Sequence, residues 1–344
     1  MAANAANLFM AAFLMKKTPA TMSIVPTSEA LFSLTVACNT FIRPTEQMLE
    51  AASSICRDAR VLHWHLTFPN VFKNGGFDCI LANPPWDRVK LQEKEFFAAR
   101  DADIANAANA NERKKLIAKL SLPREHGGNP HLLASFEAAK RRAEVASVFL
   151  HDGGRFVLAN VGDINLYSIF SEVFMRLRHP KGRAGIVVPT GICTDDSNKG
   201  IFREMVRTHV LHSLFDFENA ASGKKLFEAV DSRYRFSLLT LGQTEKTTSS
   251  FFLGKTEDIY DSRRRFELTV EDYARFNPNT MTTPIPRARR DIELLEKIYR
   301  RVPILWNEQL PNGNPWGINP TFAFGGKATL KKALQFFFCL RVGQ

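Results

Sequence analysis

The segment from Phe77 to Trp86 (FDCILANPPW) constrains the fold of this chain more than any other. Its first six residues, Phe77 to Ala82, form a short apolar run that is typical of a buried strand in a parallel sheet. The two prolines after Asn83 have no backbone N–H to donate, so the strand must end there. Because ligands bind at the carboxyl edge of open α/β sheets, this turn is predicted to lie where chemistry takes place.

From residue 154 onward, the sequence alternates between strand-like and helix-like segments. The spacing predicts a helix over Asn165–Leu177, a strand over Gly185–Pro189, a helix over Ser197–Thr208, a strand over Leu211–Phe217 and a last strand over Tyr234–Leu241. This βαβ rhythm predicts an α/β protein with an open, doubly wound sheet.

The remaining parts of the chain have a different character. Residues 1–60 read as a helical N-terminal segment, with an apolar helix near the start and a second helix after Thr45, which is a candidate N-cap. Residues 87–153 are polar and Ala-rich, and we interpret them as a helical insertion. Residues 244–344 form a basic extension, whose tail from Lys327 is a further candidate helix.

The composition indicates which kind of partner the chain binds and in which compartment it is found. Lys and Arg number 46 against 35 Asp and Glu, a net charge of +11, which favours an anionic partner such as nucleic acid. The five cysteines are scattered without a CxxC pair, which predicts a reducing, cytoplasmic location without a disulfide framework or a zinc ribbon. No apolar run reaches the roughly 18 residues that would span a bilayer.

The placement of glycines argues against a complete nucleotide site. The first glycine is Gly75, and no GxG occurs in the chain. Nucleotide cofactors usually bind on a tight glycine turn between a first strand and a first helix, where a side chain would block the ligand. The first 74 residues cannot supply that turn.

The turn from Asn83 to Trp86 suits activation of the amino group of adenine. That amino group is a poor nucleophile because its lone pair is delocalised into the ring. The side-chain oxygen of Asn83 and the carbonyl of Pro84 could accept its two hydrogens and localise the pair. Trp86 offers a face on which a flipped-out base could stack, a contact worth about 1–3 kcal/mol. The alternative is a strand-ending turn with a partly buried Trp.

An Asx-Pro-Pro-aromatic turn after a strand resembles the catalytic motif of amino-group methyltransferases that use S-adenosylmethionine. Longer strings extend the resemblance to the large adenine-specific DNA methyltransferases of restriction–modification and phage-defence systems, close to the type IIG enzymes. These strings are HWHLTFPNVF, DRVKLQEKEFFA, GDINLYSIFSE, GRAGIVVPTGICTDDS, LFDFEN, LFEAVDSRYRFSLLTL, FNPNTMTTPIPRARRD, YRRVP and NPWG, and they cover about residues 60–317.

The resemblance implies a partial Rossmann-like class I methyltransferase sheet. Residues 61–243 would be the catalytic domain, and residues 244–344 the start of a DNA target-recognition region. It implies Asn83, Pro84, Pro85 and Trp86 as catalytic residues, S-adenosylmethionine as cofactor and double-stranded DNA as partner. In such enzymes the glycine-bearing cofactor motif lies upstream of the region resembled here. We therefore expect that a separate chain supplies the cofactor-binding half, or that residues 1–60 partly cover the edge of the motif strand.

Several charged residues are further candidates. Asp78, inside the strand, could face the cofactor, with a structural hydrogen-bonding role as the alternative. Arg287, Arg289, Arg290 and Lys90 are candidate contacts to DNA phosphates, with a solvated basic face as the alternative.

Two further groups are more easily explained as structural. His63 and His65 form an HxH pair that could bind a metal, but no third ligand has suitable spacing, and we predict no metal site. Asp195 and Asp196 could touch a target strand, but capping of the helix after Ser197 is favoured.

The sequence thus predicts a site-specific DNA adenine N6-methyltransferase, or a fragment of one, within a restriction–modification or defence system. Two alternatives remain open. One is a non-catalytic DNA-binding remnant without a cofactor site. The other is a methyltransferase acting on RNA or on a protein amide nitrogen.

Overall fold

The computed structural model describes residues 1–36, 41–220, 223, 225–228, 230–311, 313 and 315–316. The helix predicted from Lys327 lies outside these residues. The chain forms two compact units, each described by itself below. The helical unit comprises the described residues of Met1–Lys73 and Arg88–Phe156, and the sheet unit comprises Asn74–Asp87 and the described residues from Val157 onward.

The helical unit contains two small apolar cores. Leu8 and Ala11 in the N-terminal apolar run are fully buried against Ala52, and a second core surrounds Phe97 and Phe136. The helices are α1 (Ala2–Leu14), α2 (Ser28–Thr35), α3 (Glu46–Asp58), α4 (Trp64–Thr67), α5 (Pro69–Lys73), α6 (Glu93–Ala98), α7 (Ala102–Ala105), α8 (Ala110–Lys119), η1 (Arg124–His126) and α9 (Pro130–Asp152).

The predicted cap of α3 is confirmed. The Thr45 side chain accepts a hydrogen bond from the backbone N–H of Met48, which satisfies one of the free donors of the first turn. The insertion predicted after the motif is helical, as α6 to α9 show.

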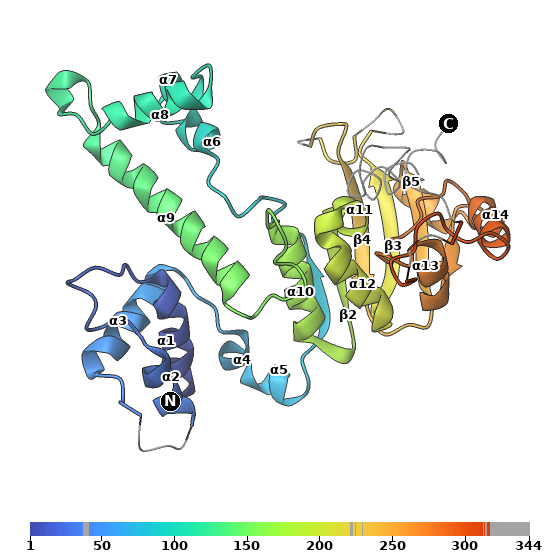
Figure 1. Ribbon diagram of the computed structural model, residues 1–344, viewed down its shortest axis with the longest axis horizontal. Helices are drawn as coiled ribbons and strands as arrows, with labels where there is room; N and C mark the ends of the chain where they lie inside the picture. Colours follow the sequence, from blue (N-terminus) through green and yellow to red (C-terminus); the bar gives the residue numbers. More distant parts are fainter. Residues whose placement is uncertain are drawn as a thin grey trace. The chain divides into compact units, whose positions relative to one another are not determined.

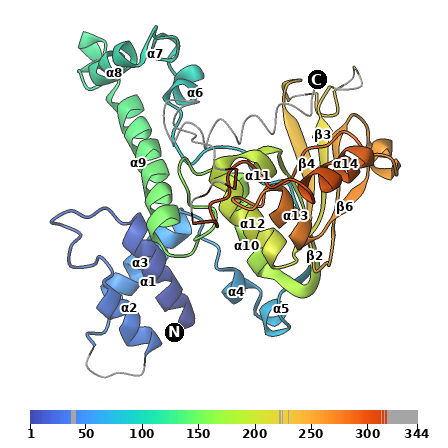
Figure 2. The same ribbon diagram turned by 45° about the vertical axis from the view of Figure 1, so that its right-hand side comes forward.

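The sheet unit is built on a six-stranded mixed sheet in the order β1-β2-β4-β3-β5-β6 (Figures 1 and 2). β1 pairs in parallel with β2, and β3 with β5, whereas β4 and β6 are antiparallel to their neighbours. The strands are β1 (Phe77–Ala82), β2 (Arg178–Pro189), β3 (Leu211–Glu218), β4 (Arg235–Leu241), β5 (Thr247–Leu253) and β6 (Phe266–Leu268). The α/β class is confirmed.

Helices α10 to α13 lie on one side of this sheet (Figures 1 and 2). The sheet unit contains α10 (Leu166–Leu177), α11 (Gly191–Thr194), η2 (Asp196–Asn198), α12 (Lys199–Arg207), η3 (Thr256–Tyr260), α13 (Val270–Phe276) and α14 (Arg289–Tyr299). Alternate strand residues such as Val188 and Leu214 are fully buried. The intervening Val187, Phe215 and Leu238 are only partly buried, so the second face is more open.

Two expectations about the sheet are wrong. Phe77–Ala82 is a parallel strand at an edge of the sheet, as expected for a sheet without its upstream strands, but it is not buried: Leu81 is 88% exposed. An apolar run predicts burial only when it has neighbours on both sides, and β1 pairs with β2 alone among the described strands. Tyr234–Leu241 is not the last strand, because β5 and β6 follow it.

In the described part of the chain, Cys56, Cys79 and Cys193 are free thiols. No group of three or more His, Cys, Asp or Glu side chains is arranged to hold a metal ion there. Likewise, none of the helices in that part combines the length and apolar character needed to cross a bilayer.

Candidate functional site

The carboxyl ends of β1, β2 and β3 meet at one edge of the sheet. Ala82, the last residue of β1, pairs with Ile186 near the end of β2. Pro189 at the end of β2 pairs with Phe236, which pairs on its other side with Phe217 of β3. Residues that follow these positions therefore share one edge, the position at which open α/β sheets bind ligands.

The turn Asn83–Trp86 begins at this edge. Asn83 and Pro85 are exposed, Pro84 is buried and Trp86 is partly buried. Among the described residues, neither the Asn83 side chain nor the Pro84 carbonyl takes part in a hydrogen bond. Both acceptors are therefore free for a ligand. Neither proline has an N–H that could occupy them.

Aromatic side chains line the edge beside the turn. Trp86 packs against a buried cluster of Phe217, Phe236 and Leu253, and its indole N–H donates to a backbone carbonyl of β2 at 3.3 Å. Phe227 meets Phe236 edge-on, with ring centroids 4.8 Å apart, and remains 41% exposed. Trp86 and Phe227 thus border the same cluster, and each is accessible in part.

A buried asparagine holds the loop that carries Phe227. The side-chain N–H groups of Asn219 donate to the carbonyls of Phe227, Val230 and Asp231 at 3.1, 3.0 and 3.3 Å. Its side-chain oxygen accepts from the Phe227 N–H at 2.8 Å. Because Asn219 is fully buried, these bonds fix the loop to the end of β3.

A buried carboxylate connects the strands at the same edge of the sheet. Asp216 of β3 is 0% exposed; it is ion-paired with Arg235 and accepts hydrogen bonds from Thr190 and from Ser237, the last at 3.0 Å. Burial raises the pKa of Asp216, although Arg235 and the hydroxyl donors act in the opposite direction. The cluster ties the ends of β2, β3 and β4 together.

The start of helix α10 is hydrogen-bonded to the residue directly after the turn. The N–H of Leu166, at the start of α10, donates to the carbonyl of Asp87, directly after Trp86, at 2.9 Å. The buried Glu172 anchors α10: its carboxylate accepts from the N–H groups of residues 157, 158 and 159 at 3.2, 3.3 and 3.0 Å. Arg176 forms an ion pair with it.

Neither Asp78 nor Gly191 provides a cradle for S-adenosylmethionine. Asp78, the predicted cofactor contact, is exposed on β1 and lies about 13 Å before the turn at the usual rise per strand residue. Gly191, the glycine after β2, offers no room, because a Cβ there would lie 2.4 Å from an Asp195 oxygen and 3.0 Å from the Tyr167 hydroxyl. The cofactor role of Asp78 stays a prediction.

The predicted DNA contacts are divided between the two units. Lys90 is exposed in the helical unit. Arg289 forms an ion pair with Glu293 at 3.1 Å, and Arg290 is exposed beside it on α14. Arg287 lies near Phe252 of β5 and is described below. A role of these residues in DNA binding stays a prediction.

The predicted cap at Asp195 and Asp196 is wrong. The residue before α12 is Asn198, and its side chain makes no capping bond. It instead donates to the Tyr167 hydroxyl at 2.9 Å and to the Gly191 carbonyl at 2.8 Å. Asp196 is ion-paired with the Lys199 ammonium at 2.9 Å. A local sequence pattern could not show that a turn of 3-10 helix precedes α12.

His63 and His65 have structural contacts in the helical unit. Nε2 of His63 lies 2.9 Å from Oδ1 of Asn7, and burial together with the charge of Arg155 lowers the pKa of His63. The ring of His65 stacks on Phe72 at 3.9 Å.

Sequence reasoning missed the residues that shape the edge around the turn. Asp216 gave one signal, since an aspartate within an apolar strand must find partners. Asn219 and Phe227 gave none, because a loop contact depends on how β3 and β4 pair.

A family model supplies an independent comparison. Residues 13–119 match the family described as Eco57I restriction-modification methylase. The matched segment includes the turn Asn83–Trp86. No curated protein matches the chain.

Solved structures of restriction–modification proteins show weak likeness. A chain of a type I R-M system is 14% identical, with 43% of this chain and 39% of that chain covered and a TM-score of 0.30. The type IIG restriction endonuclease BpuSI is 14% identical, with 48% and 20% covered and a TM-score of 0.30. A type I methyltransferase subunit from Streptococcus thermophilus is 13% identical, with 46% and 29% covered and a TM-score of 0.22.

The chain therefore spans less than half the length of each of these proteins. The family match confirms the resemblance predicted from the motifs for the segment that it covers: residues 13–119 are similar to the restriction-modification methylases.

Proposed function

We propose that this chain supplies the target-base site of a restriction–modification DNA methyltransferase that acts on the N6 amino group of adenine. The observation that carries the proposal is the pair of free acceptors at the carboxyl edge, the Asn83 side-chain oxygen and the Pro84 carbonyl, beside Trp86. The methylase family match supports the reaction class.

The chemistry follows from the hydrogen-bonding capacity of the turn. An adenine amino group has two hydrogens, and the turn has two acceptors that no neighbouring donor occupies. Accepting both hydrogens draws the nitrogen lone pair out of conjugation with the ring and makes it a better nucleophile. A base reaches the turn only after it leaves the duplex, and Trp86 and Phe227 provide faces for stacking, at about 1–3 kcal/mol per base.

S-adenosylmethionine is the methyl donor in this proposal, and double-stranded DNA is the substrate. Because neither Asp78 nor Gly191 fits the cofactor, we place its binding site on a separate chain that pairs with the edge of β1 that has no partner strand among the described residues. The 88% exposure of Leu81 on that strand supports such a partner. The cytoplasm remains the predicted compartment, on the cysteine pattern.

The test compares adenine with its analogue purine, which lacks the amino group. Each is placed once in an otherwise oligo-thymidine strand, and binding to the chain is measured by fluorescence anisotropy. Two hydrogen bonds of about 1 kcal/mol each predict roughly a tenfold or greater preference for adenine. Asn83→Ala should reduce this preference to a few-fold, with unchanged circular dichroism.

Equal binding of adenine and purine would contradict the proposal, and so would a preference that Asn83→Ala leaves intact. A stronger response to an RNA strand, or to a glutamine peptide, would favour the alternative substrates. Calorimetric titration of S-adenosylmethionine addresses the partner separately. Micromolar binding to this chain alone would place the cofactor site within it.

A further inference from the structure

Phe252 in β5 occupies an unusual position. Its φ is +59°, in the left-handed region that residues other than glycine rarely adopt. The pairing of β3 with β5 shifts register at this point, from Phe215 opposite Ser250 to Phe217 opposite Leu253. This bulge turns Phe252 out of the regular alternation of the strand.

Two arginines lie over the ring of Phe252. The guanidinium carbon of Arg235 is 4.5 Å from the ring centroid, and that of Arg287 is 5.2 Å from it. Guanidinium groups are attracted to the face of an aromatic ring. Two guanidinium groups also repel each other because both are positively charged. A pair of them around one ring is therefore stabilised by a nearby negative charge.

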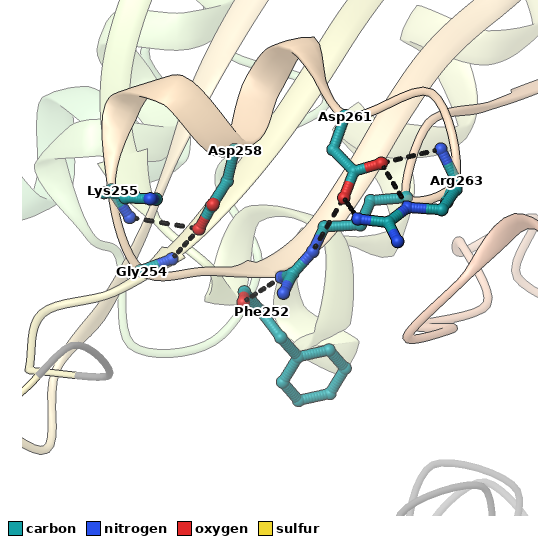
Figure 3. Close-up of polar contacts among 7 residues, drawn as sticks. Phe252, Gly254, Lys255, Asp258, Asp261 and Arg263 are labelled. Carbon is teal, nitrogen blue, oxygen red and sulfur yellow. Dashed lines mark hydrogen bonds and ion pairs between the residues drawn. The ribbon is translucent and has the colours of Figure 1, made fainter.

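The loop after β5 fixes Phe252 from behind. Figure 3 shows the Phe252 carbonyl turned toward the loop from Gly254 to Arg263 and the ring turned away from it. The Arg264 guanidinium donates to that carbonyl at 3.1 Å. Asp261 in turn holds Arg264 at 3.8 Å and Arg263 at 2.9 Å. Arg264 thus fixes the backbone of Phe252 and with it the position of the ring. We call this ring the Phe252 platform.

The charges around the platform are only partly compensated. Arg235 is neutralised by the buried Asp216, and among the described residues Asp261 is the one carboxylate that pairs with both Arg263 and Arg264. Arg287 is exposed, and its guanidinium has no carboxylate partner within the described part of the chain. The ring thus holds the Arg287 guanidinium in one orientation, with N–H donors that are available to a ligand. Such donors bind phosphate oxygens well.

The platform lies at the same sheet edge as the turn Asn83–Trp86. Leu253, the residue after Phe252, pairs with Phe217 and belongs to the cluster against which Trp86 packs. Four strand spacings separate β1 from β5, or about 19 Å at the usual distance between strands. Along a duplex this corresponds to about five or six base steps.

We infer that Arg287, held against the ring of Phe252, binds a backbone phosphate of DNA that flanks the target adenine. Arg235, which packs against the same ring, and Arg264, which is bonded to the Phe252 carbonyl, hold the ring in place. This inference rests on the proposed function, because it names the part of the substrate held beside the base site. Phe252 positions Arg287 and makes no contact with the base.

The experiment measures binding of a fluorescein-labelled DNA duplex by anisotropy over a range of salt concentrations, with no methyl donor present. Replacing Arg287 with Gln should weaken binding several-fold and lower the slope of log K against log salt by about 0.9, as expected for one lost phosphate contact. Phe252→Leu keeps the charge but removes the platform, so affinity should fall while most of the slope is retained.

Arg207→Gln is the matched control, because Arg207 is an exposed arginine at the end of α12, next to the opposite edge of the sheet. It should change the affinity less than twofold. The inference is overturned if Arg287→Gln behaves like Arg207→Gln, if the unmodified chain does not bind the duplex, or if an RNA duplex of the same sequence binds equally well. Adenine preference at Asn83 is measured separately, so either idea can fail without the other.

Discussion

Replacement of Glu172 by glutamine tests how the sheet unit supports the turn. The carboxylate accepts three backbone N–H groups, from residues 157 to 159, and forms an ion pair with Arg176. Its side chain is 1% exposed, so water cannot replace a lost acceptor. Glutamine has nearly the same shape, but one of its two terminal atoms is an N–H donor.

The size of the effect follows from these contacts. In its best orientation, the glutamine amide would keep two acceptor bonds without the charge and would leave the third N–H facing another donor. Hydrogen bonds to a charged group contribute about 1.5–3 kcal/mol each, and a neutral one about 1 kcal/mol. The lost bond and the two weakened bonds together predict a loss of about 3 kcal/mol for this region when each is taken near the lower end of its range.

Amide hydrogen exchange followed by mass spectrometry measures this loss locally. A loss of about 3 kcal/mol should accelerate exchange roughly a hundredfold in peptides that contain residues 157–177. Peptides from α3, in the helical unit, should exchange as before. Urea unfolding provides the corresponding change in midpoint.

A matched Glu-to-Gln change controls for the loss of charge alone. Glu144 forms an exposed i,i+4 pair with Lys140, at 4.0 Å, and such pairs contribute about 0–1 kcal/mol. The reasoning is refuted if Glu172→Gln accelerates exchange no more than Glu144→Gln. It is also refuted if Arg176→Gln has the full effect, since the ion pair would then be the main contribution.

Two further predictions concern the loop beside the turn and the response to acid. Asn219→Ala removes four hydrogen bonds, and the freed loop groups can bind water, so we expect the free energy of unfolding to fall by about 2 kcal/mol. Proteolysis near Phe227 should become faster and the preference for adenine weaker. Unchanged proteolysis would contradict this prediction. Burial lowers the pKa of His63 and of His212, with Arg155 and Arg183 as second causes. As the pH falls, these histidines therefore bind protons in the unfolded state before they do so in the folded state. Their contribution to stability should be complete above pH 6.5, the pKa of an unperturbed histidine, and should decrease below it. Equal urea midpoints at pH 6 and 7.5 would contradict this prediction.

Local signals predicted several elements because their causes are local. The cap at Thr45 and the apolar spacing of α10 lie within a few residues of the structure that they produce. The turn at Asn83 was also predictable, since two prolines end a strand in any context. Burial of β1 was not, because exposure of Leu81 depends on which strand lies beside it.

Elements that depend on residues distant in the sequence could not be predicted from local patterns. β5 begins with Thr and Ser residues, and Ser249 and Ser250 are fully buried, so the strand shows no alternation of apolar and polar residues. The contact of Asp216 with Arg235 requires the register of β3 against β4. Phe252 reaches its arginines through a bulge, which no spacing of side chains reveals.

The hydrogen bond between Asp87 and Leu166 has a consequence for how freely this chain can vary. The chain leaves the sheet unit after Asp87 and returns at Val157, and this bond closes the excursion a few residues after the return. The entropic cost of closing a loop rises only with the logarithm of its length, so doubling the excursion would add about 0.6 kcal/mol. The excursion also has its own apolar core around Phe97. Segments of different length and sequence could therefore be exchanged at this point while the geometry of the turn is inherited unchanged.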